Sequence, residues 1–107
     1  QAKTYDGCAG LGPCIYVPQN PLDDPFEIHI SIERAGSIVF QESISTDQMK
    51  RKPQELVDYL FRENYFPKGA FLMTGTGIVP PPDFTLDVGD IISIEIEKIG
   101  ILTNPVN

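Results

Sequence analysis

Two stretches of the chain alternate strictly between apolar and polar side chains. One covers residues 26–32 and the other residues 92–97. An alternation with a period of two places every apolar side chain on the same face of a strand. Both stretches are therefore predicted to be strands with one buried face. Their apolar members are Phe26, Ile28, Ile30 and Ile32 in the first, and Ile92, Ile94 and Ile96 in the second.

The residues next to these strands predict tight turns and returning strands. Ala35-Gly36 suits a hairpin turn, after which residues 37–44 are expected to return as the antiparallel partner. Val88-Gly89-Asp90 predicts a turn before the second alternating strand. Gly100 is expected to bend the chain after that strand, so that residues 101–106 pair back.

Three further segments are expected to be ordered. Residues 14–17 and 70–73 are apolar and β-prone, and the second predicts a short buried strand. Pro53 suits the first turn of a helix because its missing N–H costs nothing there. An apolar stripe made of Leu56, Val57, Leu60 and Phe61 follows it, so residues 53 to about 64 predict one amphipathic helix. About six strands and one helix without a βαβ rhythm predict a mainly antiparallel β (α+β) domain.

The composition fits one soluble domain. The chain has 107 residues, of which 41% are hydrophobic and 21% charged. No apolar run approaches the roughly 20 residues of a membrane span, so neither a membrane segment nor a signal peptide is expected. The formal net charge of −7 repels phosphate backbones, and nucleic-acid binding is not expected. The one basic cluster, Lys50-Arg51-Lys52, is interpreted as a solvated face, with an anion or subunit contact as the alternative.

The cysteines and the histidine predict neither a disulfide scaffold nor a zinc site. Cys8 and Cys14 are six positions apart, and the chain has one histidine. We interpret the cysteines as reduced, partly buried thiols, which suits the cytoplasm. His29 falls on the polar face of its strand and is interpreted as a surface residue, because no second base is available for a triad. The chain opens at Gln1 without a capping or leader pattern and is expected to be cut from something longer.

The segment Thr74-Gly75-Thr76-Gly77 is the strongest candidate for a ligand site. It lies between an apolar run and the Pro80-Pro81-Pro82 loop. The glycines allow the backbone to approach a ligand closely, and the hydroxyls can hold an anionic oxygen. The alternative is a turn in which a threonine caps its own backbone.

The order of motifs from this turn to the end of the chain resembles the C-terminal end of the fumarylacetoacetate hydrolase family. That family typically ends with a strand, a GTxxG-like turn, L-x-x-GD, an alternating strand and iG-x-L-x-N-x-V. The corresponding residues here are Leu86, Gly89-Asp90, Gly100, Leu102, Asn104 and Val106. The resemblance covers residues 1–107, but only about the C-terminal half of a complete family catalytic domain. It implies a mixed β-roll or sandwich that curls around a metal-containing active site.

The resemblance also implies roles for individual residues. Thr76, with Thr74 as the second choice, would bind a substrate carboxylate, and Gly75 would matter by having no side chain. Lys3 stands ahead of Gly12-Pro13, as the family's substrate-facing lysine stands before its Gly-Pro turn. Such a lysine pairs with the oxygens of a 2-oxo acid and can exchange protons near neutral pH. Without the resemblance, Lys3 would be read as an exposed side chain.

The family binds Mg²⁺, or Mn²⁺ or Ca²⁺, through a Glu-x-Glu and an Asp that precede its lysine segment. Glu95-Ile96-Glu97 places two carboxylates on one face of the predicted strand, where they could share a cation. It follows the Gly-Asp turn, however, so we interpret it as a solvated polar face. The metal ligands are expected upstream of this chain, and none is assigned within it.

The residues at 1–8 and 49–52 are most similar to the branch that dehydrates 2-keto-3-deoxy sugar acids. The implied chemistry is a magnesium-chelated 2-oxo acid whose C3 proton becomes acidic because the metal stabilises the developing enolate. One alternative is a C–C bond hydrolase, isomerase or decarboxylase of acylpyruvate-type substrates. The other is a non-catalytic half-domain that only pairs with a partner chain. The parent protein is expected to be a cytoplasmic homodimer that acts on a small 2-oxo acid.

Overall fold

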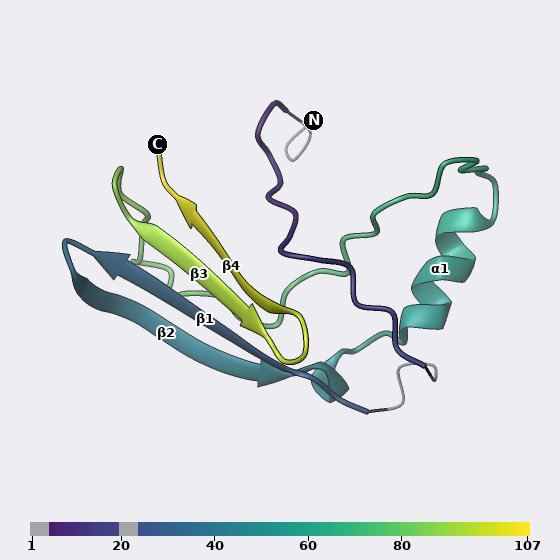
Figure 1. The fold of residues 1–107 in the computed structure, drawn as a ribbon, viewed down its shortest axis with the longest axis horizontal. Coiled ribbons are helices and arrows are strands. Elements are labelled where there is room, and N and C mark those ends of the chain that lie inside the picture. The colour runs from purple at the N-terminus through teal and green to yellow at the C-terminus, as the bar shows by residue number, and fades with distance from the viewer. Residues whose placement is uncertain (1–4, 20–23) are drawn as a thin grey trace.

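The computed structural model describes residues 5–19 and 24–107, and its main element is a four-stranded antiparallel sheet (Figure 1). The spatial order of the strands is β2-β1-β3-β4. A short 3₁₀ helix and one α-helix connect β2 to the loop that leads into β3. The elements are β1 (Glu27–Arg34), β2 (Ser37–Ser45), η1 (Thr46–Gln48), α1 (Pro53–Phe61), β3 (Ile91–Ile96) and β4 (Gly100–Pro105).

Isoleucines join the two central strands on one face, as the alternating pattern predicts. Ile28, Ile30 and Ile32 of β1 lie opposite three isoleucines of β3. Cross-strand pairs of β-branched side chains stabilise antiparallel sheets. The segment formed by residues 77–84 lies over this face, because Gly77 approaches Ile44 and the rings of Phe84 and Phe40 are 5.7 Å apart. Ile32 and Ile78 are the buried apolar residues of this small core in the described part of the chain.

The β1–β2 hairpin turn is confirmed at Ala35-Gly36. Both residues have positive φ angles, 49° and 79°, as a two-residue turn between twisted strands requires. The ladder shifts register directly after Ile32, because Ile32 faces Phe40 while Glu33 faces Ile38. Val39 is therefore an extra residue in β2, and this β-bulge increases the local twist of the hairpin.

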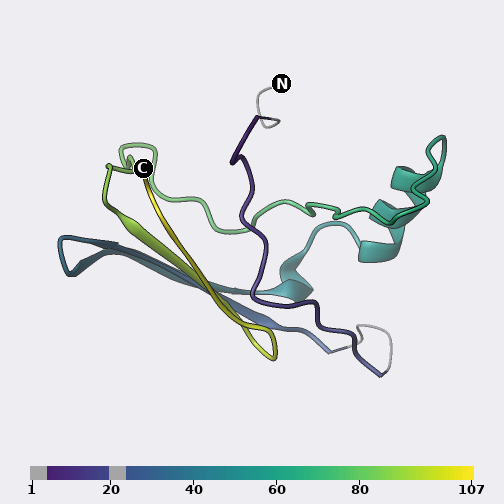
Figure 2. The ribbon, with the colours of Figure 1, turned by 45° about the horizontal axis from the view of Figure 1, so that its top comes forward.

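Helix α1 stands to one side of the sheet, to which extended segments connect it (Figures 1 and 2). It begins at Pro53 as predicted, but it ends at Phe61 rather than near residue 64. The last turn tightens, since the N–H of Arg62 donates to the carbonyl oxygen of Tyr59 at 3.4 Å. Such a bond between residues three apart ends the α-helical ladder.

Two of the predicted strands are absent among the described residues. Residues 14–17 and 70–73 are extended but belong to no sheet. Their apolar side chains are exposed, with 74% exposure at Ile15 and 68% at Phe71. An apolar run becomes a strand only when another strand satisfies its backbone groups, and the sheet does not extend to these segments. The described sheet thus has four strands instead of about six.

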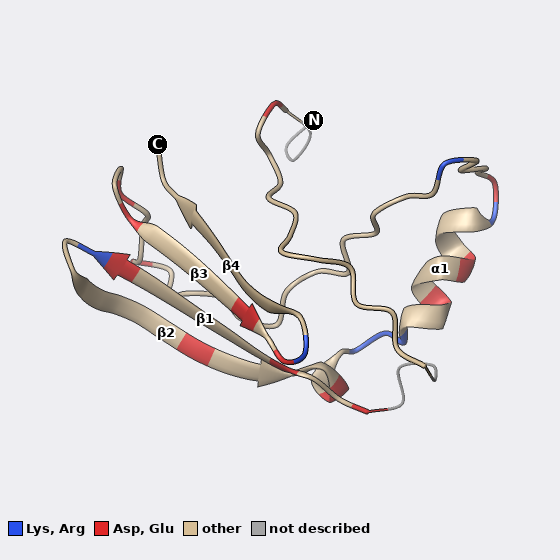
Figure 3. Ribbon diagram, viewed as in Figure 1, with Lys and Arg blue, Asp and Glu red and all other residues tan. Residues whose placement is uncertain are grey.

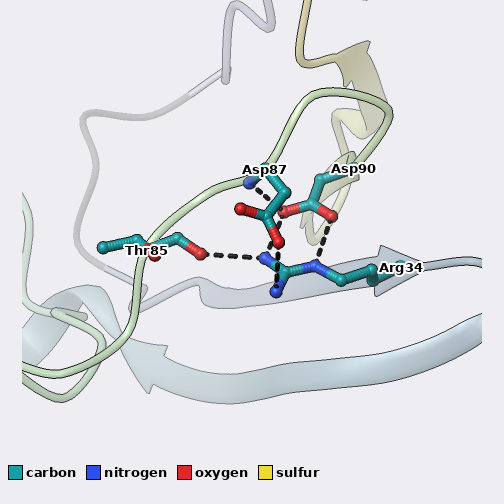
Figure 4. Close-up of polar contacts among 4 residues, drawn as sticks. All are labelled: Arg34, Thr85, Asp87 and Asp90. Atoms are coloured by element: carbon teal, nitrogen blue, oxygen red, sulfur yellow. Dashed lines mark hydrogen bonds and ion pairs between the residues drawn. The ribbon is translucent and has the colours of Figure 1, made fainter.

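Arg34 ties the end of β1 to the loop before β3 (Figure 4). Its Nε and Nη2 atoms each donate to one carboxylate oxygen of Asp90 at 2.8 Å. Nη2 also donates to the carbonyl oxygen of Thr85 at 2.8 Å, and Nη1 lies 2.7 Å from Oδ2 of Asp87. One guanidinium therefore holds three residues of the loop in place.

Asp90 is the most buried polar residue of the described chain, with no exposed surface. Hydrogen bonds from Arg34 and from the backbone N–H of Asp87 lower its pKa from 3.8 to about 2, against the opposing effect of burial. The backbone carbonyl of Asp90 also accepts a hydrogen bond from Val106 at 2.9 Å. Asp90 thus connects β1, the loop and the end of the chain after β4.

Replacing Asp90 by Asn is expected to reduce the loss of stability in acid. Because the folded-state pKa is depressed, the ionised group stabilises the fold fully above pH 3.8, and this contribution disappears as the pH falls toward about 2. The midpoint of thermal unfolding is measured by circular dichroism from about pH 6 to about pH 2. Over this range it should fall more steeply in the unsubstituted protein than in Asp90→Asn.

The variant should also unfold at least about 5 °C lower at neutral pH, since it breaks the ionic bonds to Arg34. Asp83→Asn serves as the control, because Asp83 is exposed in a neighbouring turn. If the unfolding midpoint fell equally steeply with pH in Asp90→Asn and in the unsubstituted protein, the ionised Asp90 would not be the source of the acid sensitivity.

Candidate functional site

The Thr74-Gly75-Thr76-Gly77 turn lies beside the end of β2. Gly75 has a φ of +96°, a conformation that other residues rarely adopt. Gly77 packs so closely on the sheet that an added Cβ would collide with Cδ1 of Ile44. The two glycines therefore serve different purposes: Gly75 permits the turn, and Gly77 permits its contact with β2.

The Thr76 hydroxyl hydrogen-bonds to the backbone of its own turn. It donates to the carbonyl oxygen of Ile78 at 2.9 Å and accepts from the N–H of Ile78 at 3.2 Å. This is the geometry of the self-capping alternative. It does not exclude ligand binding, because the hydroxyl proton can rotate toward an anionic oxygen while the oxygen still accepts from Ile78.

The backbone of this turn is rich in available donors. Among the described residues, no acceptor takes a hydrogen bond from the N–H groups of residues 74–77. Successive N–H groups in a turn with a glycine at positive φ form a concavity that binds anions. The turn can therefore hold a carboxylate through its backbone as well as through Thr76.

The N-terminal motif lies against β4, although Lys3 itself is outside the described residues. An added Cβ on Gly10 would lie 3.1 Å from the side chain of Asn104, and one on Gly100 would lie 3.4 Å from Pro13. The Gly-rich segment that follows Lys3 therefore packs on the closing strand. Two motifs from opposite ends of the sequence meet here.

The carboxylates of the described residues do not form a metal centre. β3 ends at Ile96 and Glu97 begins the turn after it, and the side chains of Glu95 and Glu97 are both exposed, as expected of a solvated polar face. Across residues 5–19 and 24–107, no group of three or more His, Cys, Asp and Glu side chains is placed to hold a metal ion. The described residues therefore do not fit a divalent cation by themselves.

The remaining candidate residues have ordinary surroundings. Nδ1 of His29 lies 2.8 Å from the hydroxyl of Ser43 on β2. Cys8 and Cys14 are free, as expected, but both are exposed rather than partly buried. They lie in the extended N-terminal segment, where the Cys14 thiol donates to the carbonyl oxygen of Ile99 at 3.5 Å. In the described part of the chain, no helix has both the length and the apolar character that crossing a membrane requires.

The family can be assigned from the whole chain. Residues 1–107 match the model of the C-terminal region of fumarylacetoacetate (FAA) hydrolases. The chain belongs to the fumarylacetoacetate hydrolase family. The sheet and the α-helix of the described residues thus belong to a fumarylacetoacetate hydrolase C-terminal region.

Relatives of this family member include sugar acid dehydratases. It is 43% identical, over 99% of its length, to a probable 2-keto-3-deoxyxylonate dehydratase from Haloferax volcanii, of which it covers 37%. It is 41% identical, over 99% of its length, to the 2-dehydro-3-deoxy-D-arabinonate dehydratase of Saccharolobus solfataricus, of which it covers 36%. The chain therefore spans little more than a third of the length of these relatives.

A solved structure of similar fold carries a metal and an organic ligand. It is a 2-keto-3-deoxy-D-arabinonate dehydratase complexed with magnesium and 2,5-dioxopentanoate. The TM-score is 0.77 at 41% identity, over 84% of this fumarylacetoacetate hydrolase chain and 31% of the other. The prediction of a fumarylacetoacetate hydrolase fold, mainly β with one main helix, is confirmed.

Gly77→Ala is expected to destabilise the turn through its contact with Ile44. The added methyl group must displace Cδ1 of Ile44, and overpacking of this kind costs about 1 kcal/mol or more. Ile44→Val removes that atom. The double variant should therefore be more stable than the sum of the two single effects predicts, as measured by chemical unfolding. Additive effects would contradict the contact.

Proposed function

We propose that the intact protein removes water from a 2-keto-3-deoxy sugar acid in a magnesium-dependent reaction. The observation that carries this proposal is the identity of 43% and 41%, over nearly the whole chain, to two sugar acid dehydratases. The donor-rich turn of residues 74–77 agrees with it, because every 2-oxo acid presents a carboxylate. Residues 1–107 would form the C-terminal part of the catalytic domain.

The turn is proposed to bind the carboxylate of the substrate. The backbone N–H groups of Gly75 and Gly77 would donate to its oxygens, with the hydroxyls of Thr76 and Thr74 beside them. Lys3 is proposed to face the 2-oxo group and to pair with its oxygen. An ammonium ion and a row of N–H donors both favour an anionic substrate.

The magnesium ion is proposed to be held by acidic side chains outside these 107 residues. The described carboxylates do not converge on a cation site, whereas the longer dehydratase of similar fold is complexed with magnesium. This part of the protein would thus contribute substrate-binding groups, and the metal ligands would come from elsewhere in the intact protein.

We further propose that the protein is a cytoplasmic homodimer. The two cysteines are unpaired and exposed, which suits a reducing compartment. Ile38 and Val39 on the edge strand β2 are 60% and 42% exposed. Exposed apolar side chains that lie together favour association with another surface.

The proposal is tested first by substrate choice. The intact protein with Mg²⁺ is expected to convert 2-keto-3-deoxy-arabinonate into a product lighter by one water, as measured by mass spectrometry. Removing the metal with EDTA should abolish the conversion, and added Mg²⁺ should restore it. Turnover of an acylpyruvate alone would instead support a C–C bond hydrolase of the same family.

Thr76→Val separates substrate binding from self-capping. Valine has nearly the shape of threonine but no hydroxyl, so loss of a hydrogen bond to a charged carboxylate should raise KM about tenfold. Steady-state kinetics and thermal unfolding are measured on the same preparation.

Thr85→Val serves as the control, because Thr85 contributes its backbone carbonyl rather than its hydroxyl to the contacts of this loop. If Thr76 only caps its own turn, Thr76→Val should unfold at a lower temperature, while its KM stays at the value of the unsubstituted protein.

A further inference from the structure

A pocket of about 320 Å³ opens beside the proposed carboxylate turn. It is formed where the start of β1, η1 and the start of α1 meet the turn. Thr74 belongs to both the turn and the pocket wall. The lining residues are Asp24, Pro25, Phe26, Thr46, Asp47, Met49, Pro53 and Thr74.

One wall of the pocket is fixed by a pair of hydrogen bonds between the residue before β1 and the residue after β2. The N–H of Phe26 donates to the Thr46 hydroxyl at 2.8 Å, and the N–H of Thr46 donates to the carbonyl oxygen of Phe26 at 2.9 Å. Asp47 follows Thr46 directly, and Met49 lies two residues further along the chain. The N–H of Met49 donates to the carbonyl oxygen of Thr46 at 3.2 Å, so this wall is held in position before any ligand arrives.

The contact between Gly77 and Ile44 places the turn against this wall. Ile44 lies two residues before Thr46, so the same end of β2 carries both the turn and the pocket. Thr74 and Thr76 are two residues apart, which limits their separation to about 7 Å. That span is comparable with the length of a five-carbon acid, whose two ends can reach the turn and the pocket together.

The charges in the pocket select against a second anionic group. Its charged lining residues are Asp24 and Asp47, and no Lys or Arg of the described chain lines it. Lys98 lies 5.2 Å from the ring centroid of Phe26 without belonging to the lining. The basic cluster at residues 50–52 lies between η1 and α1 (Figure 3) and is likewise not part of it. Carboxylates accept hydrogen bonds but cannot donate them.

We propose that this pocket binds the hydroxyl-bearing end of a 2-oxo acid chain, with Asp47 as the acceptor of a hydroxyl proton. The inference rests on the carboxylate-binding function proposed for the turn. The substrate is thereby oriented, because its anionic end is repelled by the acidic pocket and attracted by the N–H groups of the turn. The Phe26 ring and the Met49 side chain would cover the carbon chain.

Binding of two matched ligands tests the pocket. The ligands 5-hydroxy-2-oxopentanoate and 2-oxopentanoate differ by one terminal hydroxyl, and neither has a hydroxyl at C4 that could be lost as water. In titration calorimetry of the intact protein with Mg²⁺, Asp47→Ala is expected to weaken binding of the hydroxylated ligand about tenfold. The Kd of 2-oxopentanoate should stay within about twofold of the parent value.

Two control variants complete the test. Asp47→Asn keeps an acceptor oxygen and should lose less affinity than Asp47→Ala. Asp83→Asn changes an exposed aspartate outside the pocket and should bind both ligands as the parent protein does. The hydroxylated ligand can close to a ring in solution, which raises its apparent Kd. This effect is the same for every protein variant, so it cancels when the Kd values of the variants for this ligand are compared.

An equal loss of affinity for the two ligands, or no loss for either, would overturn the pocket assignment. Turnover of 2-keto-3-deoxy-arabinonate is measured on the same preparation. Absence of turnover would overturn the proposed dehydratase function. The proposal for the pocket is tested separately, by the ratio of the Kd values for the hydroxylated and the non-hydroxylated ligand.

Discussion

The bidentate contact between Arg34 and Asp90 joins the parts of the sheet that sequence keeps far apart. Arg34 ends β1, while Asp90 precedes β3 and accepts a hydrogen bond from the residue that follows β4. The carboxylate is fully buried, so it can remain ionised only because the guanidinium and a backbone N–H compensate its charge. Removing Arg34 would leave the buried carboxylate of Asp90 without a counter-charge, and removing Asp90 would leave N–H donors of Arg34 without an acceptor.

The candidate site depends on this anchor through the segment of residues 77–84. That segment is held at its start by the Gly77–Ile44 contact, and the residue directly after it, Thr85, accepts a hydrogen bond from Arg34. Between these ends, the ring of Phe84 packs on Phe40. The donor-rich turn therefore starts from a fixed point on the sheet, although the extended residues 70–73 that precede it lie outside any strand.

Sequence patterns predicted the elements whose cause is local. Alternation identified β1 and β3, turn residues located the β1–β2 hairpin, and Pro53 marked the start of α1. The strands expected at residues 14–17 and 70–73 were wrong because apolar character does not specify a pairing partner. The Thr74–Gly77 turn was recognised, but its pocket and the Arg34–Asp90 pair, 56 residues apart, arise from tertiary contacts that no local pattern reveals.

The extra residue Val39 links the length of a hairpin to the geometry of a distant carboxylate. The bulge strengthens the twist of the last residues of β1, and Arg34 is the final one. A planar guanidinium binds a carboxylate through two bonds only when both groups approach in one plane. An insertion or deletion between residues 35 and 39 would rotate that plane, so the length of this exposed loop is constrained by an interaction in the interior.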